Sequence, residues 1–396
     1  KIMERRIGTV SRGLRAPIVK EGDDLRKIVV DTVMACVDGG DFEIKDRDVL
    51  AITESILARA QKNYATTEQL ATDVRNKLGD ETIGVVFPIL SRNRFAICLR
   101  GIAKAAKKVV IMLSYPSDEV GNHLVDGNKV EEEGLNPYAD LLSHEEFKKH
   151  FGDSRHPFTN MNYPEYYTGI IEEEGAEAEI IFCNNPRRIV EYTDKVLCAD
   201  IHTRFNTKAA VKAAGAKVVI GMDDLMTEPV DGSGCNPEYG ILGCNKSTEG
   251  VVKLFPTKCQ EFVEGVQADI KAKTGKLIEV MIYGDGAFKD PVGKIWELAD
   301  PVVSPGYTSG LSGQPHELKL KYLADNDFAD LRGAELQAAV EKMIREKEKD
   351  VEGMMGTTPR QLTDLLGSFC DLTSGSGDKG TPFIYIQGYF DVYTDK

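Results

Sequence analysis

Apolar residues recur along the chain in two patterns, one typical of helices and one typical of buried strands. Over residues 25–36 they lie three or four positions apart, which predicts an amphipathic helix with Asp23 or Asp24 as its N-terminal cap. Residues 48–53 form a short apolar run, which predicts a buried strand, and a short helix is expected directly after it. The first part of the chain is therefore predicted to contain both kinds of element.

The middle of the chain alternates short apolar runs with amphipathic stretches. Strands are predicted over 83–87, 109–113, 179–183 and 217–222, and helices over 93–106 and 207–214. Asn206 is expected to cap the second of these helices. Strands that alternate with helices indicate a parallel sheet.

The last part of the chain joins a helix-start pattern to two strands and a glycine-rich loop. Thr257-x-x-Gln260 is predicted to be a capping box that begins a helix. Strands are predicted over 277–283 and 383–387, and the glycine-rich loop 374–380 precedes the second of them.

A chain of 396 residues suits two or three domains. We place the boundaries where the pattern changes, which gives segments 1–81, 82–230 and 231–396. The predicted fold class is a mixture of α+β and α/β, with the α/β unit in the middle segment.

Charge and cysteine content restrict the function. Sixty-three acidic and 49 basic residues give a net charge of −14, and long basic arms are absent, so we expect no nucleic-acid partner. An anionic ligand would need a metal or a basic cluster in its site. No apolar run reaches about 18 residues, so no membrane span is expected. The eight cysteines form no CxxC pair, which predicts free, mostly buried thiols in a reducing, cytoplasmic setting.

Two features at strand ends point to chemistry. Asp285 lies between two glycines after a predicted strand, where a carboxylate can bind metal or act as an acid, although a turn aspartate is the alternative. The loop 374–380 could present backbone N–H groups to a phosphate, with charge from Lys379, although it has no Walker A spacing and an ordinary loop is the alternative.

Weaker candidates lie in the middle segment. Two arginine pairs, Arg92 with Arg94 and Arg187 with Arg188, could hold a substrate carboxylate, or could be solvated loop charges. A metal could be bound by side chains of suitable type in two neighbouring stretches, namely Asp118, His123, Asp200 and His202.

The order of several blocks resembles the coenzyme F-420-0:L-glutamate ligase family, the γ-glutamyl ligases. The blocks that carry the resemblance are 13–25, 48–60, 240–256, 278–287 and 375–382. The resemblance covers roughly the first 80 and last 160 residues. It implies that the two ends form one α+β body, into which the middle α/β unit is inserted.

The resemblance implies a ligase that joins L-glutamate to a carboxylate through an amide, using GTP (or ATP) and Mg²⁺ or Mn²⁺, in a cytoplasmic homodimer. Nucleotide contacts are implied at Leu14, Arg15, Ala16, Pro17, Glu54, Ser55, Arg59, Thr248, Gly375, Ser376, Gly377, Asp378, Lys379 and Gly380. Metal contacts are implied at Asp285, Asn245, Gly286 and Ser376, with Asp285 as the catalytic residue and Asp290 as a replacement ligand.

Two functional alternatives stay open at this point. Asn245, Gly286 and Ser376 stand where the family has stronger metal ligands, so the scaffold could instead serve a repurposed or non-catalytic binding protein. The middle unit could also carry a metal chemistry of its own. The acceptor, whether a deazaflavin, a folate-like molecule or another carboxylate, is not specified by the sequence.

Overall fold

The computed structural model describes residues 7–392 and 394, except 93, 157–159, 285–286, 290–295, 299–303, 348–360, 375–376 and 393. The chain divides into two compact units. The terminal unit comprises 1–57, 258–287 and 302–396, and the central unit comprises 58–257 and 288–301. The predicted domain boundaries after residues 81 and 230 stay a prediction. The chain passes from the terminal to the central unit between residues 57 and 58, and back between residues 257 and 258.

The terminal unit is built on a four-stranded sheet. Its strands stand in the order β1 (Val10–Leu14), β15 (Phe383–Gln387), β2 (Val49–Thr53) and β12 (Glu279–Tyr283). β15 is antiparallel to both β1 and β2, and β12 is parallel to β2. Three strands therefore end at one edge of the sheet, and β15 begins there.

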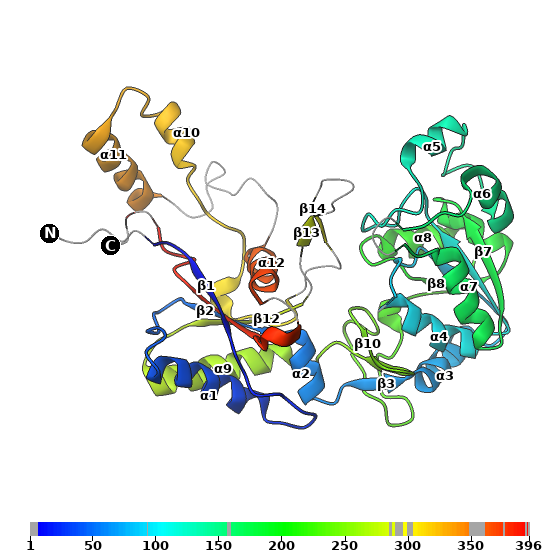
Figure 1. Cartoon of the computed structure of the whole chain (residues 1–396), viewed down its shortest axis with the longest axis horizontal. Helices are drawn as coiled ribbons and strands as arrows, with labels where there is room; N and C mark the ends of the chain where they lie inside the picture. Colours follow the sequence, from blue (N-terminus) through cyan, green and yellow to red (C-terminus); the bar gives the residue numbers. More distant parts are fainter. Residues whose placement is uncertain are drawn as a thin grey trace. The chain divides into compact units, whose positions relative to one another are not determined.

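Helices cover both faces of this sheet (Figure 1). α1 (Leu25–Asp38) and α9 (Cys259–Thr274) lie on one face, and α12 (Leu362–Ser374) lies on the other, where Leu366 and Cys370 pack against alternate residues of β2 and β15. α1 begins as predicted, because the Asp24 side chain accepts a hydrogen bond from the Lys27 amide. The remaining described elements are α10 (Leu320–Asp325), α11 (Gly333–Glu346), η3 (Ser309–Leu311) and η5 (Gly377–Lys379).

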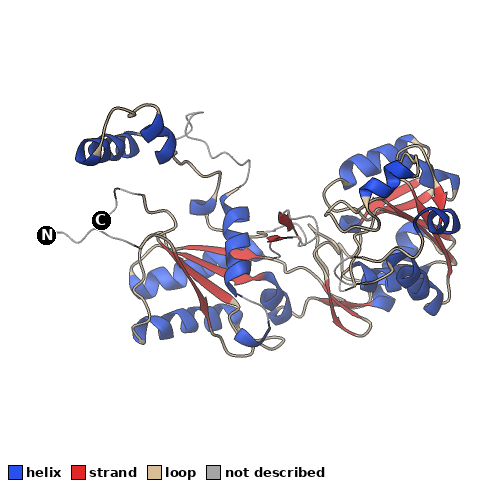
Figure 2. Cartoon of the chain, turned by 45° about the horizontal axis from the view of Figure 1, so that its top comes forward, coloured by secondary structure: helices blue, strands red, loops and turns tan. Residues whose placement is uncertain are grey.

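The central unit contains a six-stranded sheet with helices on both faces (Figure 2). The strand order is β6 (Leu142–Ser143), β7 (Glu177–Phe182), β5 (Lys108–Leu113), β4 (Thr82–Val86), β8 (Lys195–Cys198) and β9 (Val218–Gly221). All neighbours pair in parallel except β6 and β7. The predicted parallel sheet is confirmed.

Alternation along the strands divides the core of the central unit into two layers. Ile83 and Val85 of β4 face α3 (Thr67–Leu78), α4 (Phe95–Ala105) and α7 (Tyr163–Glu173), whereas Val86 faces η1 (Pro186–Glu191) and α8 (Arg204–Ala213). The unit also contains α5 (Gly127–Glu132), α6 (His144–Phe151) and η2 (Met222–Asp224), with a small sheet of β10 (Asn245–Thr248), β11 (Val251–Lys253) and β3 (Tyr64–Thr66). α2 (Glu54–Ala60) connects the two units, and β13 (Ala287–Lys289) pairs with β14 (Trp296–Leu298).

Two predicted helix caps are wrong. Asn206 lies inside α8, which begins at Arg204 after Thr203. α9 begins after Lys258, whose left-handed backbone (φ 51°) ends the preceding loop and whose side chain makes no capping hydrogen bond. The Thr257 amide instead donates to the Gln61 side chain, 2.9 Å away, so tertiary contact replaces the local capping box.

Among the described residues, none of the helices combines the length and the apolar character that crossing a membrane requires.

Candidate functional site

One edge of the terminal-unit sheet brings together segments from both ends of the chain. Leu14, the last residue of β1, pairs with Phe383, the first residue of β15. Phe383 also pairs with Ile52, and Thr53 pairs with Tyr283 at the end of β12. The loops that continue these strands therefore begin side by side, although nearly 370 positions separate the first pair in sequence (383 − 14 = 369).

Backbone hydrogen bonds hold the loops at this edge. The Ala16 amide donates to the Gly380 carbonyl at 3.1 Å, and the Thr53 amide donates to the Pro382 carbonyl at 3.1 Å. The Thr381 hydroxyl donates to the Ser374 carbonyl at 2.6 Å, which joins the end of α12 to the start of β15. These bonds hold the backbone at the strand ends, and Asp378, Lys379 and Gly380 of the neighbouring loop are exposed.

Gly13 allows β1 to approach β15 closely. A Cβ atom at this position would lie 2.9 Å from the Cβ atom of Thr381, closer than side chains tolerate. The close approach places Arg15 and Pro17, which follow β1, beside the loop that ends at Gly380. A glycine within a strand is a recognised sign of such an approach.

The glycine-rich loop carries exposed charge. Asp378 and Lys379 are exposed, and Gly380 has a left-handed backbone (φ +66°), which favours glycine. Lys379 can therefore supply the positive charge that an anionic ligand needs. Of the predicted nucleotide contacts in this loop, Gly375 and Ser376 lie outside the described residues.

The beginning of α2 completes this edge. α2 follows β2 without an intervening loop, so the backbone N–H groups of its first turn, at Glu54 and Ser55, start where the sheet ends. Glu54 is 4% exposed, whereas Ser55 is exposed. The structure therefore brings together the predicted contacts Leu14–Pro17, Glu54, Ser55 and Gly377–Gly380.

Three further predicted contacts belong to the central unit. Arg59 is exposed in the last turn of α2, and Asn245 and Thr248 lie on β10. Asn245 pairs with Lys253, and the register of the strand shifts before Thr248. Their predicted place in the same site stays a prediction, because they and the sheet edge belong to different units.

The metal prediction falls largely on residues that the structure does not describe. Asp285, Gly286, Ser376 and Asp290 lie outside the described residues. Within the described part of the chain, no group of three or more His, Cys, Asp or Glu side chains is arranged to hold a metal ion.

The metal site considered for the middle segment is wrong, since its four residues are all described and form no such group. Asp118 is buried and accepts hydrogen bonds from the Leu90 amide (2.9 Å) and from both the amide and the side chain of Asn122 (2.8 Å each), so it fixes a turn. Asp200 is buried and accepts from the Thr203 and Thr207 hydroxyls. Both carboxylates therefore have structural partners.

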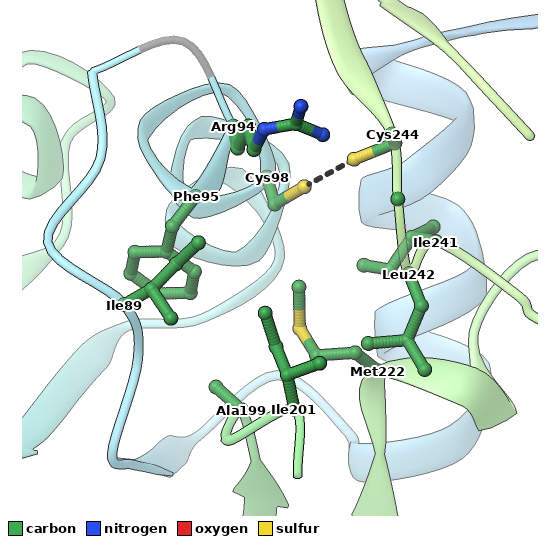
Figure 3. A pocket seen from close by; sticks show the side chains of 11 residues that line it. Ile89, Arg94, Phe95, Cys98, Ala199, Ile201, Met222, Ile241, Leu242 and Cys244 are labelled. Carbon is green, nitrogen blue, oxygen red and sulfur yellow. Dashed lines mark hydrogen bonds between the residues drawn. The ribbon is translucent and has the colours of Figure 1, made fainter. Parts of the chain in front are cut away.

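The two arginine pairs differ in their surroundings. Arg188 pairs with Glu191 and donates to the Ala139 carbonyl at 3.2 Å, so its guanidinium is already engaged within the protein. Arg94 stands at the N-terminus of α4 and lines a small, mainly apolar hollow of the central unit, together with Phe95 and Met222 (Figure 3).

The sequence interpretation missed the supporting residues of the sheet edge. The Thr381 hydroxyl donates to the Ser374 carbonyl. The Thr53 amide donates to the Pro382 carbonyl, which links the end of β2 to the start of β15. The signal available in the sequence was Gly13 within an otherwise strand-like segment, which is typical of close backbone approach. All eight cysteines are free and six of them are buried, as predicted.

Comparison with known proteins identifies a family for the chain. No curated protein matches the chain. The family model described as F420-0:Gamma-glutamyl ligase matches residues 13–388. The match runs from Gly13 at the sheet edge to the glycine that follows β15, and it includes the central unit. The chain therefore belongs to the F420-0:gamma-glutamyl ligase family, a family of ligases.

Proposed function

We propose that the terminal unit is a nucleotide- and divalent-metal-dependent γ-glutamyl ligase that joins L-glutamate to an acceptor carboxylate. The observation that supports it is the sheet edge at which β1, β2, β12 and the loop before β15 meet. GTP is the proposed co-substrate, with ATP as the alternative. The family match supports the ligase class, and the nucleotide is our extension of it.

The chemistry of the edge suits a triphosphate. Successive backbone N–H groups of a glycine-containing loop, together with those at the start of a helix, can bind phosphate oxygens. Exposed Arg15 and Lys379 would add positive charge, which matters in a protein whose net charge is −14. A carboxylate-binding ligase must hold several anions at once, so these two cations have a clear electrostatic purpose.

The proposed reaction proceeds in two steps. An oxygen of the acceptor carboxylate attacks the γ-phosphorus, the bond to the nucleoside diphosphate breaks, and an acyl phosphate forms. The neutral amine of glutamate then attacks the acyl carbon, inorganic phosphate leaves, and the nitrogen loses a proton to give the amide. Lys379 and Arg15 would neutralise the charge that develops on the phosphate oxygens.

A divalent metal fits the donor atoms at the predicted positions. Asp285 supplies a carboxylate and Ser376 a hydroxyl, and oxygen ligands are those that Mg²⁺ and Mn²⁺ prefer. The amide oxygen of Asn245 belongs to the central unit, and its part in the same site stays a prediction. In this proposal Asp285 is the main ligand. When bound, the metal would supply Lewis-acid stabilisation of phosphate charge.

The proposal is tested by product analysis. The full chain is incubated with L-glutamate, GTP or ATP, Mg²⁺ or Mn²⁺, and a panel of acceptor carboxylates that includes a deazaflavin and a folate. Mass spectrometry should find an acceptor enlarged by one glutamate less one water, together with the nucleoside diphosphate. Lys379→Ala should reduce the yield, whereas Lys273→Ala, an exposed lysine on α9, should not. Absence of product and of nucleotide cleavage with every acceptor would refute the proposal.

A second candidate is a repurposed binding protein on the same scaffold. It is favoured by the single carboxylate, that of Asp285, among the four predicted metal positions. In that case Asp285→Ala should leave ligand binding unchanged, whereas loss of triphosphate cleavage in this variant would exclude the candidate. The homodimer and the cytoplasmic location also stay proposals, and light scattering of the purified chain tests the first of them.

A further inference from the structure

Two buried cysteines of the central unit touch one another although they lie far apart in sequence. Cys98 is on α4, and Cys244 directly precedes β10. Their sulfur atoms are 3.2 Å apart across 146 positions of the chain, and both residues are buried. Figure 3 shows the two side chains pointing toward one another. Both belong to the same compact unit, so the fold of that unit alone places two thiols in direct contact.

The backbone that carries Cys244 is held in place by its packing. Gly243 has a left-handed backbone (φ +69°), and a Cβ atom there would lie 2.6 Å from the ring of Phe255, so the chain passes close to that ring. The Ile241 amide donates to the Met222 carbonyl at 3.1 Å, which fixes the other end of the segment. The segment therefore has little freedom to carry Cys244 away from α4.

α4 holds the other sulfur atom equally firmly. Nine of the eleven residues of α4 are buried, and a Cβ atom at Gly101 would lie 2.7 Å from the side chain of Leu70 on α3, so the two helices are closely packed. Sulfur atoms joined in a disulfide are about 2.05 Å apart, so side-chain rotations that close about 1.2 Å would join Cys98 to Cys244. The bond needs an adjustment of this pair and no meeting of distant segments.

A small hollow gives solvent a way to the pair. Cys98 and Cys244 both line it, and part of it is open to solvent. Its cavity volume of about 30 Å³ has room for about one water molecule. Hydrogen peroxide is only slightly larger than water, whereas a bulky thiol reagent is far larger than the hollow. We therefore expect a small oxidant to reach the two sulfur atoms in the folded protein.

The contact between the sulfur atoms acts in opposite directions on the two steps of oxidation. The hydrogen bond with Cys244, together with burial, raises the pKa of the Cys98 thiol well above its ordinary value. A protonated thiol is a weak nucleophile, so the first attack on an oxidant is slow. The second step is fast, because a sulfenic acid on one sulfur atom meets the other thiol at once. The pair therefore rests as thiols, and its first oxidation leads to a disulfide.

We propose that Cys98 and Cys244 are an oxidative modification site, at which hydrogen peroxide converts the two thiols to a disulfide. One sulfur atom, having released its proton, attacks a peroxide oxygen; the O–O bond breaks, and a sulfenic acid and water form. The second thiol attacks the sulfenic sulfur, the S–S bond forms, and the sulfenic oxygen leaves as a second water molecule. The pair loses two electrons and two protons in all, and the peroxide is reduced.

The disulfide would change the central unit in two measurable ways. It would close a loop that contains β5, β6, β7, β8 and β9, and a bond across so long a loop restricts the unfolded chain strongly. We expect the midpoint of thermal unfolding of this unit to rise by roughly 5–10 °C. The bond would also fix residue 244 to α4, so hydrogen exchange of the β10 amides, which follow directly, should become slower.

The proposal is tested by peptide mapping of the full chain. The protein is reduced with dithiothreitol, freed of it, and treated in the folded state with increasing amounts of hydrogen peroxide. Free thiols are then blocked with N-ethylmaleimide in denaturant, and unreduced proteolytic peptides are identified by mass spectrometry. We expect two peptides joined through Cys98 and Cys244, lighter by two hydrogen atoms than their sum and separated by dithiothreitol. Maleimide on both cysteines at every peroxide ratio, or sulfinic acid without the joined peptides, would overturn the proposal.

Three variants localise the effect. Cys98→Ser and Cys244→Ser each leave one thiol without its partner, so peroxide should no longer raise the unfolding midpoint of the central unit. The matched control is Cys183→Ser, which removes another buried thiol of the same unit and should keep the full rise. If a serine variant does not fold, the peptide map of the wild-type protein still decides the matter. An unchanged rise in a folded Cys98→Ser variant would contradict the assignment.

Peptide masses, unfolding midpoints and exchange rates are all measured without substrates. Failure of this proposal is therefore separate from failure of the proposed ligase function.

Discussion

The two large sheets end in edges of different chemistry. At the terminal-unit edge the strands continue into exposed backbone loops, with Gly380 in a left-handed conformation and Lys379 in solvent. At the central-unit edge the strands continue into an apolar hollow with one guanidinium, that of Arg94. The first edge is exposed and polar, whereas the second is apolar apart from one guanidinium.

This difference shows how a mixed sheet and a mainly parallel sheet bring segments together in two ways within one chain. In the central unit the carboxyl ends of neighbouring parallel strands bring distant segments together, whereas in the terminal unit β15 begins between the ends of β1 and β2 and is antiparallel to both. In the terminal unit the segments meet through backbone hydrogen bonds, such as that from Ala16 to Gly380. In the central unit they meet through side chains, such as the Asp118 carboxylate that accepts the Leu90 amide. Substitutions can therefore test the backbone contacts of the terminal unit and the side-chain contacts of the central unit separately.

The largest effect is expected at the opposite edge of the terminal-unit sheet. The Asp48 side chain is 2% exposed and accepts hydrogen bonds from the Lys45 amide (2.8 Å), the Tyr385 hydroxyl (2.9 Å) and the Gln387 amide group (2.9 Å). Asp48→Ala should lower the free energy of unfolding of this unit by about 3 kcal/mol, because buried donors lose their acceptor.

Hydrogen exchange of the β2 amides measures this loss within the terminal unit, and Tyr385→Phe serves as a milder control that removes one donor. Triphosphate affinity of the folded Asp48→Ala protein should be unchanged, since Asp48 precedes β2 and the candidate site follows it. Loss of affinity in a folded variant would show that the two edges are not separate.

The next effect is expected from the turn that supports the central-unit edge. Asp118→Ala removes the acceptor of four hydrogen bonds, two of them from Asn122. We expect a loss of about 2 kcal/mol in the stability of the central unit, because the buried Leu90 amide loses its acceptor. Hydrogen exchange of the β4 amides measures this loss, and wild-type exchange rates in the variant would contradict the role given to this turn.

Gly13→Ala tests the close approach at the terminal-unit edge. The added methyl group meets Thr381, so β1 and β15 must separate, at a cost of about 1–2 kcal/mol. We also expect weaker triphosphate binding, because the loop before β15 is displaced. Gly8→Ala is the matched control, since a Cβ atom there meets no other atom within 4 Å. Equal thermal stability of the two variants would show that the approach is not needed.

The smallest effect is expected from an exposed ion pair between the helices on one face of the terminal-unit sheet. Arg26 of α1 binds both carboxylate oxygens of Asp269 of α9, at 2.6 and 2.7 Å. Both side chains are more than a third exposed, so Arg26→Ala should lower stability by less than about 1 kcal/mol.

The same pair gives a pH dependence. The hydrogen bond from Arg26 lowers the pKa of Asp269 below its ordinary value. The stabilisation is therefore present above the pKa of the unfolded carboxyl and disappears as the pH falls through the lower, folded value. Urea titrations at neutral and acidic pH should show a difference between wild type and Arg26→Ala that shrinks on acidification; a difference that grows would contradict this explanation.

Local pattern was sufficient to predict most of the elements. β15 has the predicted bounds 383–387, and β2 and β5 differ from prediction by one residue at their starts. These segments are buried runs of apolar residues, so the burial of each segment and its intrinsic preference for strand predict the same element. The caps at Asn206 and Thr257 failed because tertiary contacts decided the helix starts, as the bond from Thr257 to Gln61 shows.

The two sites were predictable to different degrees. The family-like blocks at both chain ends pointed to the terminal-unit edge, where the structure brings Leu14–Pro17 and Gly377–Gly380 together. The hollow of the central unit was not predictable, because Ile89, Met222 and Leu242 are ordinary apolar residues in sequence and come together only through the fold. The one local signal was Arg94 at a helix start.

The most direct test of the account is a calorimetric titration of the full chain with GTP and Mn²⁺, compared among wild type, Lys379→Ala and Lys273→Ala. The account places triphosphate at the terminal-unit edge, so the wild-type and Lys273→Ala proteins should bind alike. Lys379→Ala should bind roughly tenfold more weakly, the magnitude of one charge-assisted contact. Absence of binding to the wild-type protein, or equal affinity in Lys379→Ala, would contradict the account.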